Sequence, residues 1–327
     1  MCVDTAKHLD YSIKWSRAVK ADLGKNIVYE FIPENIVSVL YRPFVKLSLY
    51  YDRKLNEMRY QLPTIFGDKA ERNTRAITFT DSGSQKPFFA IACNSVFDYH
   101  LAGASAASVA IPELGFDQDR SIENVTDWGY DQFRRQYEPS RTKPKRPISK
   151  KAIFHYVYGV LHDPVYREKY AQNLKREFPR IPFYADFWQW ADWGKALMEL
   201  HIGYEGVAPA KLKRADVPDE KARKAGQTPK AMLKADKDAG RIVLDSETTL
   251  AGVPPEAWNY KLGNRSGLEW ILDQYKESKP KDPTIREKFD TYRFADYKEK
   301  VIDLLARVTT VSIETQRIVE AMKKAVR

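Results

Sequence analysis

The sequence has few cysteines, with only Cys2 and Cys93 among 327 residues. Two cysteines give no disulfide framework and no Cys-x-x-Cys pair for a structural zinc ion, so we expect a reducing, cytoplasmic location. The sequence also lacks an apolar run of about 18 residues, which a membrane-spanning helix needs. Asp4 and Lys7 fall where a signal peptide would have its apolar stretch. We therefore expect neither secretion nor contact with a membrane.

Motifs for three kinds of catalysis are also missing. The Gly-Lys pairs at Gly24 and Gly194 lack the first glycine and the hydroxyl residue of a phosphate-binding loop. Val253-Pro254-Pro255-Glu256 lacks the polar and aromatic members of the turn with which adenine methyltransferases hold a flipped base. The five histidines and the group Asp296, Glu299 and Lys300 fit packing and solvated helix faces better than a metal site. We expect no catalytic centre, cofactor or metal in this chain.

The composition does support a folded and basic protein. Hydrophobic residues make up 43% of the chain and aromatic residues 13%, which is enough for a sizeable core. Lys and Arg number 54 against 44 Asp and Glu, a formal net charge of +10. The segment 141–180 alone has eleven basic residues and three acidic ones. This band favours a polyanionic partner such as nucleic acid.

The apolar pattern predicts an α+β fold. Its first part is a mixed β-sheet subdomain over residues 1–140, with one helix at 34–40, entered through Pro33, and one sheet of strands at 46–51, 76–79, 88–93 and 108–111. A helix capped by Thr126 or Asp127 runs to Tyr137. A helical subdomain over 148–206 follows a proline-rich basic loop, and its helices cover 150–161, after a Ser149 cap, 165–177 and 185–200.

The third part covers 207–327 and is predicted to pack on the rest. It begins with a basic linker over 207–240, rich in Lys, Ala, Asp and Pro. A β-hairpin of strands 241–244 and 248–250 follows, then a helix at 267–275. A long helix at 296–322 carries an apolar stripe and closes the chain.

Basic and amide residues in loops beside strands are the candidates for DNA contact. Arginine can hold guanine O6 and N7 with two hydrogen bonds, and asparagine or glutamine can do the same for adenine N6 and N7. The candidates are Arg53, Lys54, Asn56 and Arg59 after the strand 46–51; Ser82, Ser84, Gln85 and Lys86 in a second polar loop; and Lys143, Lys145 and Arg146 in the basic loop. The alternatives are an Arg53–Glu57 ion pair in the first loop and a plain hairpin connection in the second.

Several long motifs carry a family resemblance. They are Tyr41-Arg42-Pro43-Phe44, the stretches 51–57, 152–164, 166–170, 174–182, 260–266 and 268–275, and Val311-Ser312-Ile313-Glu314-Thr315. Together, from about Lys14 onward, they resemble the C-terminal specificity domain of type ISP restriction-modification enzymes. These motifs are mostly aromatic and proline-rich, and they identify the domain without identifying the residues that read bases.

The resemblance implies a function in DNA recognition. Enzymes of this family combine nuclease, ATP-driven translocase, N6-adenine methyltransferase and target-recognition parts, and only the last is similar to this sequence. The implied partners are double-stranded DNA and the methyltransferase and translocase/nuclease domains, in the same or a partner chain. S-adenosylmethionine, ATP and Mg would belong to those domains. The alternative is an architectural domain that docks its neighbours through its helical part and touches DNA only non-specifically.

Overall fold

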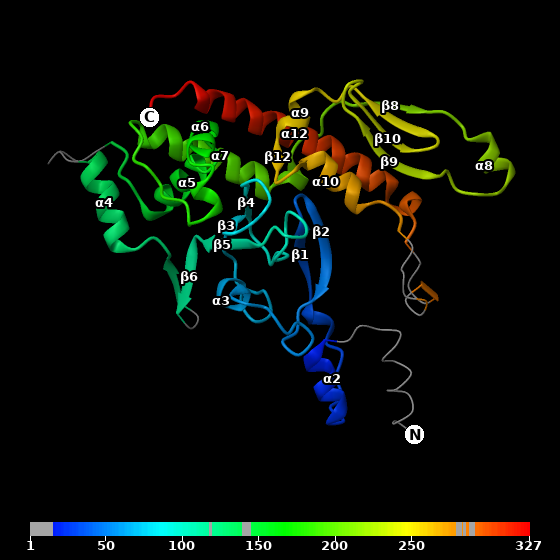
Figure 1. The fold of residues 1–327 in the computed structure, drawn as a ribbon, viewed down its shortest axis with the longest axis horizontal. Coiled ribbons are helices and arrows are strands. Elements are labelled where there is room, and N and C mark those ends of the chain that lie inside the picture. Colours follow the sequence, from blue (N-terminus) through cyan, green and yellow to red (C-terminus); the bar gives the residue numbers. More distant parts are fainter. Residues whose placement is uncertain (1–15, 118–119, 139–144, 279–282, 284–285, 288–291) are drawn as a thin grey trace.

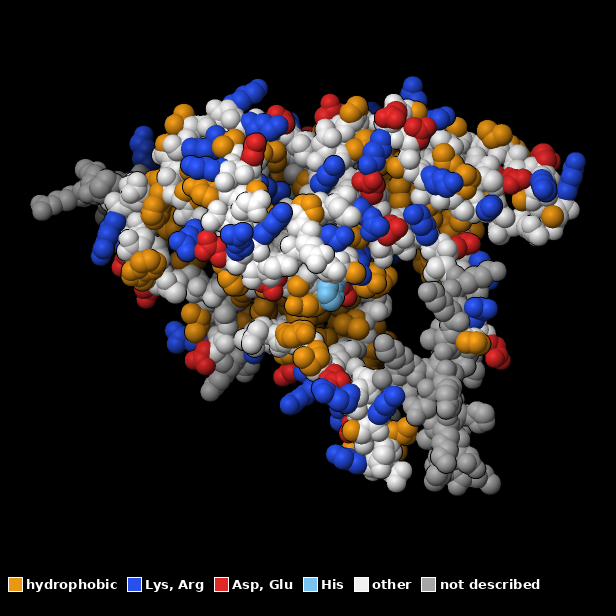
Figure 2. Space-filling view, viewed as in Figure 1, with side chains coloured by type: hydrophobic (Ala, Val, Ile, Leu, Met, Phe, Trp, Pro, Cys, Tyr) orange, Lys and Arg blue, Asp and Glu red, His pale blue; other side chains and the backbone are white. Residues whose placement is uncertain are grey.

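A computed structural model describes residues 16–117, 120–138, 145–278, 283, 286–287 and 292–327. It has the expected α+β fold, in which long helices form one layer and small sheets and loops extend from that layer (Figure 1). Lys and Arg side chains are spread over the helical layer, and hydrophobic side chains gather beside the hairpin of β1 (Ile36–Arg42) and β2 (Val45–Tyr50) (Figure 2). No helix among the described residues has the length and apolarity to cross a membrane.

The prediction of a helix at 34–40 is wrong. After α2 (Arg17–Gly24), a 3-10 turn covers only Pro33–Asn35, and β1 (Ile36–Arg42) follows. β1 pairs antiparallel with β2 (Val45–Tyr50), and Phe44 makes the turn between them with a φ of 62°. Ile36, Val37 and Val39 are β-branched and suit a pleated strand, and the available partner strand decides between helix and strand.

The four expected strands do not form one sheet. In the described part of the chain, the strand predicted at 46–51 is β2, which pairs with β1 alone. The other three are β3 (Ala76–Thr80), which lies between β4 (Ala90–Cys93) and β5 (Ser108–Pro112), all antiparallel. Leu40 connects the hairpin to this sheet region, since its N–H donates to the Val96 carbonyl at 2.9 Å. The short helix α3 (Leu62–Phe66) and the hairpin of β6 (Leu114–Asp117) and β7 (Arg120–Glu123) complete this part of the fold.

Most of the predicted helices of the middle segment are confirmed. Thr126 caps α4 (Asp127–Tyr137), Ser149 caps α5 (Lys150–Val160), and α7 covers Phe187–Ile202. The helix expected at 165–177 is instead the short α6 (Pro164–Lys169) followed by a 3-10 turn at Asn173–Lys175. Only Tyr166 and Leu174 are buried in this segment, so little packing stabilises a longer helix.

The prediction that residues 207–240 form a basic linker is also wrong. After a 3-10 turn at Tyr204–Gly206, it contains β8 (Lys213–Asp216), α8 (Glu220–Lys224) and β9 (Ala231–Asp236). These strands join the predicted pair, β10 (Arg241–Asp245) and β11 (Thr248–Ala251), in the order β8-β11-β10-β9. Ile242 and Leu244 of β10 and Leu250 of β11 are buried in the core. The outer edges of these two strands pair with β9 and β8, and this pairing outweighs the low β-propensity of the Lys- and Asp-rich segments.

The helices predicted at 267–275 and 296–322 are confirmed, whereas a short helix and two short strands that precede them were not predicted. α9 (Glu256–Asn259), the short strands β12 (Lys261–Leu262) and β13 (Arg265–Ser266), and α10 (Gly267–Gln274) precede a 3-10 turn at Phe294–Tyr297 and α12 (Lys298–Lys323). Ser266 caps α10 together with Glu269 in a capping box.

Two hydrophobic cores hold the elements together. The first includes Phe44 and Leu305, and the second includes Ile153 and Trp190. The β3–β5 sheet contributes to both, and so does α12, which places Val301 to Val311 in the first core and Ile318 and Met322 in the second. Each core contains residues from more than one of the three predicted parts, 1–140, 148–206 and 207–327. The division into these parts therefore stays a prediction.

Candidate functional site

The loop after β2 is a tight, polar turn organised by Asp52. The Asp52 N–H donates to Asn56 Oδ1 at 2.9 Å, the Asn56 N–H donates to the Asp52 carbonyl at 2.8 Å, and the Lys54 N–H donates to Asp52 Oδ1 at 2.7 Å. Asn56 therefore uses its side-chain oxygen inside the loop, and its amide NH2 group remains for another partner. Arg53 is exposed and, among the described residues, its side chain has no hydrogen bond or ion pair.

Arg59 is held inside the protein, unlike Arg53. Its guanidinium donates to Asp68 Oδ1 at 2.9 Å and to the Asp68 carbonyl at 3.1 Å, and it lies 4.9 Å from the centre of the Tyr51 ring. Only 9% of its side chain is exposed. These contacts fix the loop against the segment 67–69.

The alternative ion pair between Arg53 and Glu57 is not formed. Glu57 pairs instead with Arg17 of α2, at 2.7 Å, and the hydrogen bond from Arg17 lowers the pKa of the Glu57 carboxyl. Arg53 is thus left free of a structural role in the described part of the chain.

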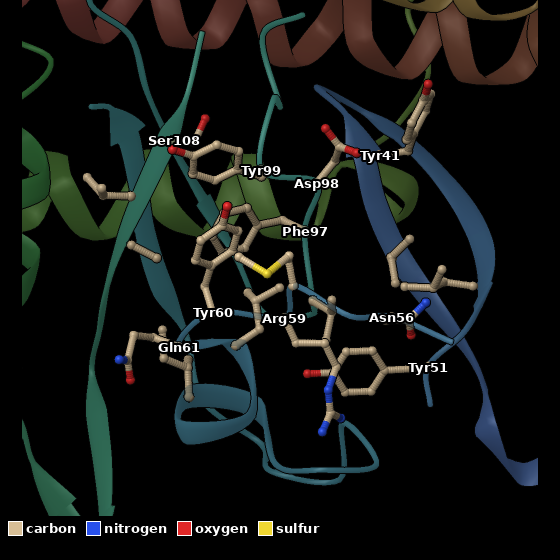
Figure 3. Close-up of a pocket in the computed structure, with 18 of the residues that line it drawn as sticks. Tyr41, Tyr51, Asn56, Arg59, Tyr60, Gln61, Phe97, Asp98, Tyr99 and Ser108 are labelled. Atoms are coloured by element: carbon tan, nitrogen blue, oxygen red, sulfur yellow. The ribbon is translucent and has the colours of Figure 1, made fainter. Parts of the chain in front are cut away.

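A cavity of about 820 Å³ opens beside this loop, between the β1–β2 hairpin, α3 and β5. Figure 3 shows Tyr60 and Tyr99 on one side of it, and Asn56 and Tyr51 on the other. The rings of Tyr60 and Tyr99 stack with their centres 5.1 Å apart, and Tyr60 is 60% exposed and Tyr99 39% exposed. Tyr60 has a φ of 47°, a conformation that bulky residues rarely adopt and that often marks a functional loop.

The buried wall of the cavity holds one polar group without a partner. Tyr51 is 2% exposed, and its hydroxyl has no hydrogen bond within the described structure. Burial is the main reason why the pKa of Tyr51 is raised, with the nearby Arg59 acting in the opposite direction. The cavity therefore combines an apolar, aromatic wall with a few amide, hydroxyl and guanidinium groups, the usual composition of a recognition site.

The second predicted loop meets the same cavity through Asp81. The Ser82 hydroxyl donates to Asp81 Oδ1 at 3.4 Å, and the Ser84 hydroxyl donates to the Ser105 carbonyl at 3.2 Å and accepts from the Lys86 N–H at 3.2 Å. Gln85 is exposed, and the described structure gives its side chain no partner. Of the predicted candidates, only Asn56 and Arg59 line the cavity, and the second loop reaches it through Asp81 alone. The structure does not place Arg53, Lys54, Ser82, Ser84, Gln85 or Lys86 in its lining.

The third predicted group is the basic loop with Lys143, Lys145 and Arg146, and the structure describes two of these three residues. Lys143 lies outside the described residues, and Lys145 is exposed. Arg146 is committed to Asp192 through hydrogen bonds of 2.7 and 2.6 Å, and its guanidinium stacks 3.6 Å from the centre of the Trp188 ring. The hydrogen bond from Arg146 lowers the pKa of the Asp192 carboxyl. Arg146 therefore fastens the end of the basic loop to α7.

Sequence reasoning missed Met58, Tyr60, Gln61 and Tyr99, which line the cavity. A possible signal was the run Met58-Arg59-Tyr60-Gln61, four large side chains directly after a polar turn. Tyr99 gives no such signal, because it reaches Tyr60 only through the fold. Metal binding finds no support here, since no group of three His, Cys, Asp or Glu side chains in the described regions could hold an ion.

The fold and the sequence match a known family of domains. The family model of the type ISP C-terminal specificity domain matches residues 4–304. The chain therefore belongs to this family, and the resemblance seen in the sequence motifs is confirmed. A search of the curated proteins found no match.

Three solved structures are similar to this chain. The cryo-EM structure of the DrdV–DNA complex has a TM-score of 0.89 and 47% identity, and the match covers 97% of this chain and 31% of that one. A nuclease-deletion mutant of the type ISP enzyme LlaGI, in complex with a DNA substrate mimic, has a TM-score of 0.74 and 26% identity, covering 96% and 27%. The type ISP enzyme LlaBIII bound to DNA has a TM-score of 0.75, 20% identity and coverage of 96% and 20%, and it supports the fold alone. The chain thus spans less than a third of each of these proteins.

Proposed function

We propose that this chain recognises a specific sequence in double-stranded DNA, as the specificity domain of a type ISP restriction-modification enzyme. It would direct N6-adenine methylation and ATP-dependent restriction that other domains carry out. The observation that carries this proposal is the family match over residues 4–304, together with two similar proteins, at 47% and 26% identity, whose structures contain DNA or a DNA mimic.

The proposed base readers are the loop residues whose side chains keep unused hydrogen-bonding groups. Arg53 and Gln85 are exposed and have no partner in the described structure, and the half-buried Asn56 keeps its amide NH2 group. Lys86, Lys143 and Lys145 would contact phosphates, which set register and affinity without reading sequence. Arg59 and Arg146 would position these segments, because both are already bound to carboxylates.

The other components of the reaction would come from other domains. S-adenosylmethionine, ATP and Mg would bind the methyltransferase and translocase/nuclease domains, in the same or a partner chain. The proposal also places the enzyme in the cytoplasm, where cellular DNA and these cofactors occur.

Selection from a random duplex library tests the proposal. The purified chain, alone and mixed with a type ISP methyltransferase part, should enrich one short asymmetric site over random DNA. Affinity should also fall with salt, and each phosphate contact contributes about 0.9 to the slope of log affinity against log salt. The alternative architectural domain would bind all sequences weakly and alike, and no enrichment in either mixture would refute the proposal.

A further inference from the structure

Exposed hydrophobic side chains are concentrated in one short part of the chain. Nineteen large hydrophobic residues are exposed among the described residues, and ten of them lie between positions 23 and 60. Those ten are Leu23, Ile27, Val28, Phe31, Ile32, Ile36, Leu47, Leu55, Met58 and Tyr60. Single exposed hydrophobic residues are normal, whereas a contiguous group on a soluble domain marks an interaction surface.

The first described segment packs very little of itself into the protein. α2 has no buried residue, and Asn35 is the one buried residue between positions 16 and 36. Figure 1 shows α2 projecting from the end of the β1–β2 hairpin, away from the helical layer. An isolated helix of eight residues is marginal in water, so this segment needs further contacts to be stable.

A few contacts nevertheless hold the segment on the hairpin in a defined position. The Tyr29 hydroxyl donates to Asp22 Oδ2 at 2.7 Å, the Ile32 N–H donates to the Tyr50 hydroxyl at 3.0 Å, and the Phe31 and Tyr50 rings stack at 5.5 Å. These contacts leave Val28 87% exposed and Phe31 66% exposed. The hydrophobic side chains are therefore presented outward in a fixed arrangement.

The segment and the hairpin enclose a groove of about 600 Å³. Its hydrophobic lining consists of Val28, Phe31, Ile32, Ile36 and Leu55. We call these five residues and the groove between them the N-terminal apolar surface.

The charges in the groove indicate what it can bind. Glu30 and Asp52 line it together with a single cation, Lys54, whose ammonium lies 5.6 Å from the centre of the Tyr29 ring. Two carboxylates against one amine disfavour a DNA backbone, which requires an excess of cations. A groove with apolar walls and a few charged groups at its edge suits the hydrophobic side chains of another protein domain.

We propose that the N-terminal apolar surface docks the domain that precedes the specificity domain in type ISP enzymes. The matched family is by its description a C-terminal domain, and the match covers only 31% of the DrdV chain, so most of such a protein comes before this part. The surface includes the first described segment of the chain. The inference rests on the proposed function, because the partner is part of that enzyme.

Docking at this surface would also place the base-reading loop. Lys54 and Leu55 line the groove, and the next residue, Asn56, lines the cavity on the other side of the loop. The loop would therefore lie at the seam between the two domains, where a duplex held by both of them could be read. This arrangement differs from the docking through the helical part that the sequence suggested.

The test mixes the chain with the DrdV polypeptide lacking the part that matches this chain, and measures complex formation by sedimentation velocity. Val28→Asp and Phe31→Asp should weaken the complex at least tenfold. Trp128→Asp is the matched control, because Trp128 is 75% exposed on α4, away from the groove, and this variant should bind like the unmodified chain. All three residues are exposed, and circular dichroism confirms that the variants fold.

Several results would overturn the proposal. They are no complex with the unmodified chain, equal binding by all variants, or loss of binding with Trp128→Asp. Self-association of the unmodified chain that Val28→Asp abolishes would assign the surface to a second copy instead. Duplex binding of each variant is measured separately, so failure of docking with intact DNA selection refutes this inference and leaves the proposed function standing.

Discussion

Arg53 and Arg59 stand six positions apart in one loop, and the structure predicts opposite effects of replacing them. Arg59→Ala removes a hydrogen bond to the Asp68 carboxylate, another to the Asp68 carbonyl, and the contact with the Tyr51 ring. The ion pair contributes at most about 1 kcal/mol, since Asp68 is 80% exposed and water screens it. The carbonyl hydrogen bond and the cation–π contact add about 0.5–1.5 and 0.5–1 kcal/mol. We expect Arg59→Ala to lower the free energy of unfolding by about 1–3 kcal/mol.

Arg53→Ala should leave the free energy of unfolding within about 0.5 kcal/mol of the unmodified chain, because the residue is exposed and no partner is lost. It should instead cost about 1–3 kcal/mol in binding at the selected DNA site and relax the preference at one base position. Urea unfolding measures the first quantity, and binding to single-base variants of the site measures the second. An Arg59→Ala variant as stable as the unmodified chain, or a destabilised Arg53→Ala variant, would refute the reasoning.

Three further predictions concern packing, pH and phosphate contacts. A Cβ at Gly194 would overlap the His155 carbonyl oxygen where α7 crosses α5, so Gly194→Ala should lower the free energy of unfolding by about 1–3 kcal/mol. Gly206→Ala is the control for thermal unfolding, because a Cβ there meets open space. Burial lowers the pKa of His155 to about 4 and that of His201 to about 3. Below about pH 6.5 the unfolded chain therefore binds more protons than the folded one. As the pH falls from 6.5 to the folded pKa, each of these histidines should lower the free energy of unfolding by about 1.4 kcal/mol per pH unit. Equal urea midpoints at pH 7 and pH 5 would contradict this. Lys145→Ala should weaken binding to every duplex alike and reduce the salt slope by about 0.9, and a change confined to one sequence would instead make Lys145 a base reader.

Local signals predicted the elements that carry their own cap or apolar pattern, and missed the strands that depend on a partner strand. Ser149 and Thr126 are cap residues followed by helical spacing, and both helices begin at the expected residues. The segment from Ile36 to Arg42 has no comparable local signal, because its strand depends on pairing with Val45–Tyr50. The Lys- and Asp-rich strands β8 and β9 are still less visible, since the partner strands β11 and β10 supply their stabilisation.

The candidate site shows the same limit. The sequence could place Arg53, Asn56 and Arg59 in one loop, because they follow a clear strand. It could not show that Arg59 is bound to Asp68 and Arg53 is free, since that depends on where the segment 67–69 folds back. The stacking of Tyr60 on Tyr99 joins residues far apart in sequence, and only the packing of the hairpin against the β3–β5 sheet region brings them together.

The helix α12 has a consequence for how the protein opens. It contributes to both hydrophobic cores, and the Thr315 hydroxyl lies 3.0 Å from Nε2 of the buried His201. At the end of the chain, Arg327 hydrogen-bonds to the buried Asp163 next to α5. Neither core can therefore open without releasing one end of this helix. Amide hydrogens at the centre of α12, around Val308 to Ser312, should exchange with solvent only when the whole domain unfolds, and the slowest amides of both cores should share that one rate.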